Sequence, residues 1–460
     1  MGNRLLYFTL ALLSIASVTA NAADEKSPAQ KPNIIFILSD DVGLGDVHCT
    51  GGHYSTPNID ALAKGGMRFE YCYATPLCGP SRALFLTGRY PFRTGLISNQ
   101  SAAALGAHNE IMIPTVMKKA GYATACVGKW GQMPYGPGEW GFQEFLSFHG
   151  SGRYSPDQKI EYQQNGEWKK LQEGEYLPDL MHAFIVSFLE KNKDKPFFLY
   201  YPMSHIHGPI LKTPDSNKGE NKDQLYADNV EYMDKLVGQL VAELDRLKLR
   251  EKTLVLFAGD NGTARFGKEI STVDGKAISG QKATMLEGGS RVPLVVNWPG
   301  VTPAGKVSKD LTDFSDFFGT FCELSGAQLP EGVKIDSHSI APQIKGEKGT
   351  PRDWIYVELG GKSYVRDARY KLTNAGKLFD LKNAPFEEIP VADDTTDADA
   401  LAAKKKLQAV LDDHPAKDAS GILKKDRKAR KAAKQAARQG GGKKRRTVIQ
   451  QVSAAGVFAP

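Results

Sequence analysis

Two short runs of oxygen-bearing side chains are placed to bind a cation. Asp40-Asp41 follows the apolar run at residues 34–38, and Asp260-Asn261 follows the apolar run at residues 253–258. Carboxylate and amide oxygens, with no cysteine or histidine in the same motif, suit a hard cation such as calcium or magnesium. Asp40 and Asp41 would point to opposite faces of a strand, so the chain must turn there for both to reach one ion. Taken alone, each run could equally be a helix cap or a turn.

A second candidate group lies in residues 78–89, which read Cys-Gly-Pro-Ser-Arg-Ala-Leu-Phe-Leu-Thr-Gly-Arg. Pro80 is tolerated in the first turn of a helix, so Cys78 is expected at a helix N-terminus. Backbone N–H groups and the helix dipole favour an anion at that place. Arg82, one turn further on, can reach the same anion. The alternative from the residues alone is an ordinary capped helix with a buried thiol.

The elements that must position these groups alternate along the chain. Apolar runs typical of buried strands lie at residues 34–38, 196–201, 253–258 and 293–298, and helical patterns lie at residues 59–65, 113–120 and 228–247. This alternation predicts an α/β fold in which helices sandwich a large, mostly parallel mixed sheet. Ligands bind such sheets beyond the carboxyl ends of the strands. Asp40-Asp41, His205 with His207, and Asp260-Asn261 each follow an apolar run, which predicts one shared site.

Residues 78–88 resemble the signature of type I sulfatases, Cys-x-Pro-Ser-Arg-x-x-x-Leu-Thr-Gly, and every fixed position is filled. Other segments resemble this family in its own order, over about residues 32–390. They are residues 32–46, 56–63, 128–130, 207–209, 260–262, 282–289 and 378–381. The resemblance implies an arylsulfatase-like sulfuric ester hydrolase with the fold of the alkaline phosphatase superfamily.

The resemblance also implies how the reaction proceeds. A formylglycine-generating maturation enzyme would oxidise Cys78 to formylglycine (3-oxoalanine), and a hydroxyl of the hydrated aldehyde would attack the sulfur of a sulfate ester. One Ca2+ per active site would assist this step. The implied calcium ligands are Asp40, Asp41, Asp260, Asn261 and residue 78 itself.

The basic side chains receive roles from the same resemblance. Arg82 is expected to hold the hydrated aldehyde and to offset developing negative charge. Lys129 and Lys282 are expected to bind the sulfate oxygens. His207, in the pattern His-Gly-Pro, is the expected general acid, and His205 is the alternative.

One position departs from the family pattern. The family usually has a histidine directly after Gly-Lys-Trp, but Gly131 follows Trp130 here. That imidazole normally contacts the reacting diol or the sulfate. Its absence leaves three interpretations open: an unusual substrate, a substitute side chain such as Gln132 or His149, or reduced activity.

Two other functions also stay open. A phosphodiester or phosphonate monoester hydrolase of the same superfamily would act on esters of similar shape, although two-metal phosphatases of this fold add histidine-rich zinc sites, and Asn261 follows Asp260 here. An inactive relative that binds sulfated glycans would fit the loss of the histidine at Gly131. For an active enzyme the expected substrate is a sulfated carbohydrate, with small aryl or alkyl sulfates as the alternative.

The N-terminus predicts export. Arg4, the apolar stretch at residues 5–18 and Ala20-Asn21-Ala22 have the pattern of a signal peptide over residues 1–22. A membrane anchor is disfavoured because the apolar run is too short to span a bilayer easily. No integral membrane segment is expected in the mature chain, which would be secreted or periplasmic. The expected parts are a catalytic domain at 23–348, an antiparallel C-terminal subdomain at 349–395 and a basic tail at 396–460.

The net charge of +7 comes from that tail, because residues 421–446 hold twelve lysines and arginines and one aspartate. The rest of the chain is therefore acidic, and nucleic acid is not an expected partner. The tail is either a solvated, partly disordered appendage or a tether to acidic polysaccharide or a membrane surface. No Cys-x-x-Cys pair suggests zinc or a redox dithiol. Whether Cys49, Cys72, Cys126 and Cys322 form disulfides stays open.

Overall fold

The computed structural model describes residues 31–101, 105, 110–131, 133–217, 221–267 and 269–416. The predicted signal peptide, Gln132 and the basic run at residues 421–446 lie outside these ranges. Within them, no helix combines the length and the apolar character that a membrane span requires.

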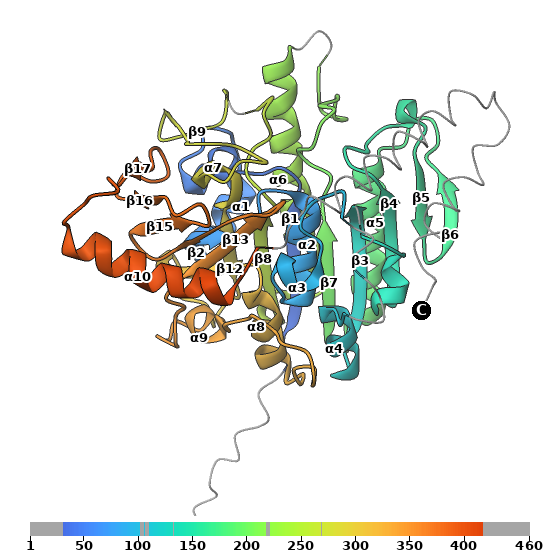
Figure 1. The fold of residues 1–460 in the computed structure, drawn as a ribbon. Coiled ribbons are helices and arrows are strands. Elements are labelled where there is room, and N and C mark those ends of the chain that lie inside the picture. The colour runs from blue at the N-terminus through green and yellow to red at the C-terminus, as the bar shows by residue number, and fades with distance from the viewer. Residues whose placement is uncertain are drawn as a thin grey trace, which may run out of the picture. The chain divides into compact units, whose positions relative to one another are not determined.

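One large sheet forms the centre of the described chain. Its strands are β1 (Asn33–Ser39), β2 (Met67–Tyr73), β3 (Ala123–Gly131), β4 (Glu144–His149), β5 (Glu161–Gln164), β6 (Glu167–Lys170), β7 (Phe197–Pro202), β8 (Thr253–Gly259), β11 (Leu294–Asn297) and β12 (Lys306–Asp313). They are ordered β12-β2-β11-β8-β1-β7-β3-β4-β5-β6 (Figure 1). Neighbours within the run β8-β1-β7-β3-β4 are all parallel, which confirms the predicted mostly parallel mixed sheet.

The apolar run at residues 293–298 forms β11, which is antiparallel to both of its neighbours, β8 and β2. A strand buried inside a sheet is apolar whichever way it runs, so composition alone does not give its direction. The sheet is therefore mixed on both sides of its parallel centre, because β5 is also antiparallel to β4 and to β6.

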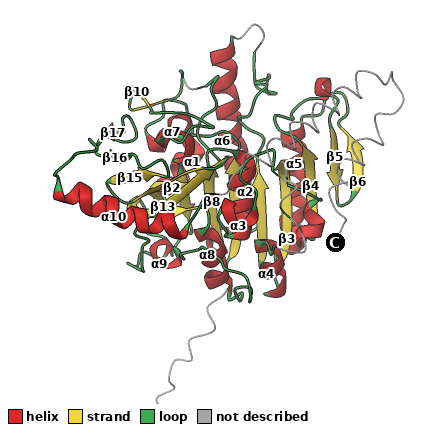
Figure 2. Cartoon of the chain, in the orientation of Figure 1, coloured by secondary structure: helices red, strands yellow, loops and turns green. Residues whose placement is uncertain are grey.

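Helices cover both faces of this sheet (Figure 2). They are α1 (Pro57–Lys64), α2 (Cys78–Thr87), α3 (Pro91–Thr94), α4 (Ile113–Lys119), α5 (Leu177–Asn192), α6 (Lys222–Arg246) and α8 (Asp316–Ser325). Alternate residues of β1 enter two cores. Phe36 stacks on Phe85 of α2 at 4.1 Å and lies 4.8 Å from Phe317 of α8, between ring centroids. Ile35 and Ile37 lie in the other core, with residues of α5 and α6. Both faces of β1 are thus buried, which explains its continuous apolar sequence.

A second, smaller sheet follows. Its strands are β13 (Ile355–Leu359), β14 (Lys362–Arg366), β15 (Tyr370–Thr373), β16 (Leu378–Asp380) and β17 (Ile389–Pro390), and each is antiparallel to the next. This confirms the predicted small antiparallel sheet. Helix α10 (Ala398–Asp413) packs against β14 and β15. Tyr73 of β2 and Leu311 of β12 share a buried cluster with Ile355, Val357 and Tyr364, so the small sheet packs against the edge of the large one.

All five cysteines lie in the described residues, and none of them is in a disulfide. Burial raises the pKa of the Cys72 and Cys126 thiols, and raises that of Cys322 to about 12. These three thiols are therefore protonated at neutral pH and act as small apolar groups in the core.

Candidate active site

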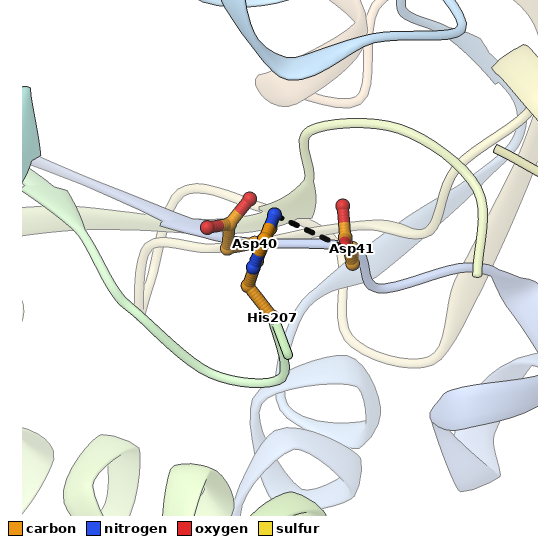
Figure 3. Close-up of side chains that lie close together, drawn as sticks. All are labelled: Asp40, Asp41 and His207. Atoms are coloured by element: carbon orange, nitrogen blue, oxygen red, sulfur yellow. Dashed lines mark ion pairs between the residues drawn. The ribbon is translucent and has the colours of Figure 1, made fainter. Parts of the chain in front are cut away.

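The two acidic runs meet at the carboxyl ends of the adjacent parallel strands β1 and β8. Ser39 and Gly259 are the last paired residues of these strands, and the Asp260 N–H donates to the Ser39 carbonyl at 3.0 Å. Asp41 has a left-handed backbone conformation, with φ of 65°. This turn lets Asp40 and Asp41 face one region (Figure 3), where the Asp41 N–H donates to Asp260 Oδ1 at 3.0 Å.

Cys78 lies beside these carboxylates. It is the first residue of α2, and every residue of that helix is buried. One oxygen each of Asp40 and Asp260 and the Cys78 sulfur all lie within 4.8 Å of one another. Asn99 completes the surroundings, because its Oδ1 accepts from the Gly79 N–H at 2.9 Å and its Nδ2 is 3.5 Å from Cys78 Sγ. Asn99 is not predicted from the sequence, because it lies in no motif and is brought to Cys78 only by the fold.

Arg82 is held from several sides by buried groups. Its Nη2 and Nε donate to Asp260 Oδ2 at 2.7 and 3.1 Å. Its Nη1 donates to the Lys129 carbonyl at 3.2 Å and to the Tyr200 hydroxyl at 3.4 Å. Burial lowers the pKa of the guanidinium, but Tyr200 and Asp260 raise it by more, so Arg82 stays charged. A fixed cation one turn into α2 is suited to an anion at residue 78.

Two lysines from distant parts of the sequence reach the aspartates. Lys129, on β3, is fully buried, and its Nζ donates to both carboxylate oxygens of Asp40 at 2.6 and 2.8 Å. Lys282 donates to Asp41 Oδ1. Burial works to raise the pKa of Asp40, but the positive charges of Lys129 and His207 hold it below its ordinary value.

The structure brings His207 to this cluster. Its Nε2 lies 3.8 Å from Asp41 Oδ2 (Figure 3). Its Nδ1 is 2.6 Å from the Gly208 carbonyl oxygen, which can only accept a hydrogen bond. Nδ1 therefore carries a proton, and Nε2 is the ring nitrogen that lies near Asp41.

His205, the alternative acid, is placed elsewhere. Its ring is fully buried, and its Nε2 lies 3.1 Å from the Tyr176 hydroxyl. The Tyr154 and Tyr232 rings also lie against it, with centroids at 5.3 and 6.0 Å. Burial lowers the pKa of His205 to about 3, so the ring is neutral at physiological pH. Its contribution to the site is through the backbone, where its carbonyl accepts from the Asp40 N–H at 2.7 Å.

The oxygen atoms of the cluster fit a hard cation. Asn261 Nδ2 donates to Asp41 Oδ1 at 2.9 Å, while the buried Asn261 Oδ1 has no hydrogen-bond partner among the described residues. Burial and then the negative charge of Asp40 raise the pKa of Asp260. A divalent cation would satisfy the amide oxygen and relieve the repulsion between the carboxylates.

Position 131 faces the same cluster. A side chain added at Gly131 would place its Cβ 3.7 Å from both Arg82 Cδ and Lys129 Cε, which is ordinary contact distance. Gly131 therefore lies in contact with the side-chain stems of these two cations, and its φ of 78° is one that favours glycine. His149, one of the proposed substitutes, pairs with Gly131 across β3 and β4, and its ring stacks on Trp168 of β6 with centroids 5.6 Å apart.

Comparison with known proteins gives consistent matches. The model of the family described as Sulfatase matches residues 32–327. N-acetylgalactosamine-6-sulfatase of Canis lupus familiaris is 32% identical over 79% of this chain and 74% of its own length. Arylsulfatase A of Homo sapiens is 31% identical over 75% of each chain. The crystal structure of Ps i-CgsB in complex with k-i-k-neocarrahexaose is 30% identical, with a TM-score of 0.74, over 85% of this chain and 94% of that one.

Proposed function

Because this chain belongs to the sulfatase family of the alkaline phosphatase superfamily and is a sulfate-ester hydrolase, we propose how it acts and on what. Residue 78, converted from cysteine to formylglycine by a maturation enzyme, carries the nucleophilic oxygen. A calcium ion assists it, and the substrate is a sulfated carbohydrate. The products are the free alcohol and inorganic sulfate.

One observation carries this proposal. The N-terminus of α2, with residue 78, lies among Asp40, Asp260 and Arg82 at the carboxyl edge of the large sheet. Parallel sheets bind ligands at this edge, and a helix N-terminus favours an anion such as sulfate. Chain segments far apart in sequence supply the acids, the thiol and the cations, which a merely structural buried cysteine would not require.

The acidic residues would hold the cation. Asp40, Asp41, Asp260 and Asn261 offer oxygens to it, together with residue 78. When bound, the ion would lower the pKa of the nucleophilic hydroxyl and polarise the sulfate ester. Hard oxygen ligands and the absence of a histidine after Asp260 favour calcium over zinc.

The basic residues act on the sulfate group. Arg82, fixed by Asp260, keeps a positive charge beside residue 78. Lys129 and Lys282 offer ammonium groups that can turn from carboxylates to sulfate oxygens. Such preorganised cations stabilise the negative charge that grows on those oxygens as the ester bond breaks.

His207 completes the set as the general acid. Its Nδ1 proton is held by the Gly208 carbonyl, so protonation at Nε2 gives an imidazolium whose Nε2–H faces the site. Asp41 Oδ2 lies 3.8 Å from this nitrogen. The Nε2 proton would pass to the ester oxygen as the alcohol leaves.

Exposed aromatic groups beside position 131 favour a carbohydrate substrate. Trp168 is 55% exposed on edge strand β6 and stacks on His149. A side chain added at Gly150 would meet the Arg153 guanidinium at 3.6 Å, so this cation lies next to His149. An exposed indole can stack on a sugar ring, and an arginine can bind a further sulfate. The protein of similar fold, Ps i-CgsB, was crystallised with an oligosaccharide.

Export and domain limits are further parts of the proposal. Residues 1–22 would be removed as a signal peptide, leaving a secreted or periplasmic enzyme. Residues 23–348 would form the catalytic domain and residues 349–395 the C-terminal subdomain. Sequencing the N-terminus of the protein isolated from culture would test the cleavage: a first residue before position 20 would contradict it.

The proposal is tested by sulfate release. Matured wild-type enzyme should release inorganic sulfate from a sulfated oligosaccharide, and Cys78→Ala should lower kcat by at least about a thousandfold, because it removes the nucleophile. Hydrolysis of phosphate diesters to a phosphate monoester and an alcohol, with equal kcat/KM, would favour the phosphodiesterase alternative. Tight glycan binding by the wild-type enzyme with no turnover would favour the inactive relative.

A further inference from the structure

Residues 279–289 form a segment that we call the lysine loop, because it carries Lys282. Its backbone is hydrogen-bonded to the segment after Asp260 and to the segment before Cys78. The Lys282 N–H donates to the Thr263 carbonyl, beyond the Asp260 turn, at 3.0 Å. The next N–H, of Ala283, donates to the carbonyl of Pro76, two residues before Cys78, at 2.8 Å. The position of this backbone therefore sets where the Lys282 ammonium can reach.

A buried ion pair of the small sheet also contacts the backbone of the lysine loop. Lys371, on β15, and Glu388, just before β17, are joined by Nζ and Oε2 at 2.6 Å. The same Nζ donates to the Met285 carbonyl at 2.6 Å, and Glu388 Oε1 accepts from the Glu287 N–H at 2.9 Å. Both members of the pair thus use a second contact on loop backbone, three and five residues beyond Lys282.

Burying an ion pair in a core costs free energy. The side chains of Lys371 and Glu388 are each only 2% exposed. Removing two charges from water costs several kcal/mol per ion before their attraction is counted, and apolar residues of similar size often stabilise as well. Apolar residues could not, however, donate to one backbone carbonyl and accept from an N–H two residues later. The pair is suited to fixing a backbone.

The far end of the lysine loop has its own anchor. The Glu287 carboxylate accepts from the Tyr73 hydroxyl at 2.8 and 3.0 Å and is paired with Arg366 at 3.3 Å. Ser279, at the near end, donates its N–H to the Pro385 carbonyl at 2.8 Å. With both ends held independently, loss of the Lys371 contacts should loosen the middle of the loop rather than unfold it.

We infer that Lys371 and Glu388 are positioning residues for Lys282, acting through the backbone of Met285 and Glu287. This inference rests on the proposed role of Lys282 in binding sulfate oxygens. It makes the small sheet part of the catalytic apparatus, although both residues lie beyond the span matched by the family model, residues 32–327.

A double-mutant cycle tests the inference. Lys371→Met keeps the volume but removes the contacts, and should lower kcat/KM by about 10- to 100-fold, because small misplacements of catalytic groups have effects of this size. In a Lys282→Ala background the same change should cost less than about threefold, since its target is gone. Equal losses in both backgrounds would overturn the inference. Lys371→Arg, which keeps charge and donors, should recover part of the activity.

A matched control lies in the same sheet. Lys377 pairs with Asp393 at 2.8 Å on the surface, away from the lysine loop, so Lys377→Met should leave kcat/KM unchanged. If Lys377→Met lowered kcat/KM as much as Lys371→Met, then removing any charge from this sheet would lower activity. That result would contradict a specific role for Lys371.

A readout without turnover separates this inference from the proposed function. Lys282 should react slowly with an amine-acetylating reagent in the wild-type protein, because it is paired with Asp41 and largely buried. Lys371→Met should raise that rate several-fold, while the fully buried Lys129 stays protected. Unchanged labelling of Lys282 would overturn the inference even if the enzyme is an active sulfatase. Faster labelling would uphold it even if no sulfate ester is hydrolysed.

Discussion

At the scale of single residues, the proposed general acid is His207, which would protonate the leaving alcohol. We predict that His207→Gln lowers kcat on a sugar sulfate by about 100-fold or more, the usual contribution of a general acid. A nitrophenyl sulfate should lose much less, because its leaving group departs without a proton. Steady-state kinetics on both substrates measure the difference. Equal losses on the two would assign His207 to binding rather than to proton transfer.

For His205 we predict an effect on the free energy of unfolding. Burial lowers its pKa from 6.5 to about 3, whereas in the unfolded chain it returns to about 6.5. Below pH 6.5 the unfolded state therefore binds a proton that the folded state does not, and stability falls as the pH drops toward 3. Between pH 7 and pH 5 this group should remove about 2 kcal/mol from the free energy of unfolding. Urea titrations of His205→Gln should show a pH dependence smaller by that amount, and an unaltered slope would count against a neutral buried ring.

Residue types and motifs predicted the chemistry of the site more readily than they predicted the surroundings of each side chain. The convergence of Asp40, Asp260 and Cys78 could be expected from strand-end positions and motif order. Asn99 could not, because a single amide in an irregular segment carries no periodic or motif signal. The separate placements of His205 and His207 also needed the structure, since the His-Gly-Pro pattern favours His207 but does not show that His205 is buried beside Tyr176.

At the scale of elements, edge strand β6 is expected to select the substrate. We predict that Trp168→Ala raises KM for a sulfated oligosaccharide by about tenfold, the loss expected for one aromatic stacking contact. KM for a small aryl sulfate, which does not reach β6, should stay the same. Leu329→Ala, which removes an equally exposed apolar side chain far along the chain, is the control. A rise in KM for both substrates would contradict a sugar-binding role.

Strands that are buried on both faces can be predicted well from the sequence. The direction of a strand and its pairing partners are predicted poorly. Phe36 and its neighbours in β1 are buried on both faces, so an apolar run suffices to recognise that strand. The direction of β11 depends on hydrogen bonds with β8 and β2, which lie far away in the sequence. The grip of Lys371 on the lysine loop is a long-range contact of the same kind.

At the scale of the whole molecule, α10 is an integral part of the described fold. Ala400, Ala403, Leu407 and Leu411 are buried on its inner face, and the His414 ring lies 5.0 Å from the Trp354 ring. We predict that truncation after Asp394 lowers the free energy of unfolding by on the order of 4 kcal/mol, the value of the lost apolar burial. Truncation after Ala416, which keeps α10, should leave it unchanged in calorimetry. Equal stability of the two truncated proteins would refute this role.

The molecule as a whole assembles one site from two sheets. The acids follow strands of the large sheet and Lys129 lies on one of them, Cys78 begins helix α2, and the small sheet contacts the lysine loop. Arg82 and Lys129 are both buried, and each is paired with a carboxylate, Asp260 and Asp40 respectively. We propose that residue 78, once converted to formylglycine, becomes the nucleophile of this site.

The most direct test of that claim is mass spectrometry of the tryptic peptide spanning residues 69–82, from protein made in its native host or together with a maturation enzyme. We predict a mass in which the Cys78 thiol is replaced by an aldehyde or its hydrate, while Cys72 in the same peptide keeps its thiol. An intact thiol at Cys78, under conditions in which a control sulfatase is converted, would contradict the proposed nucleophile.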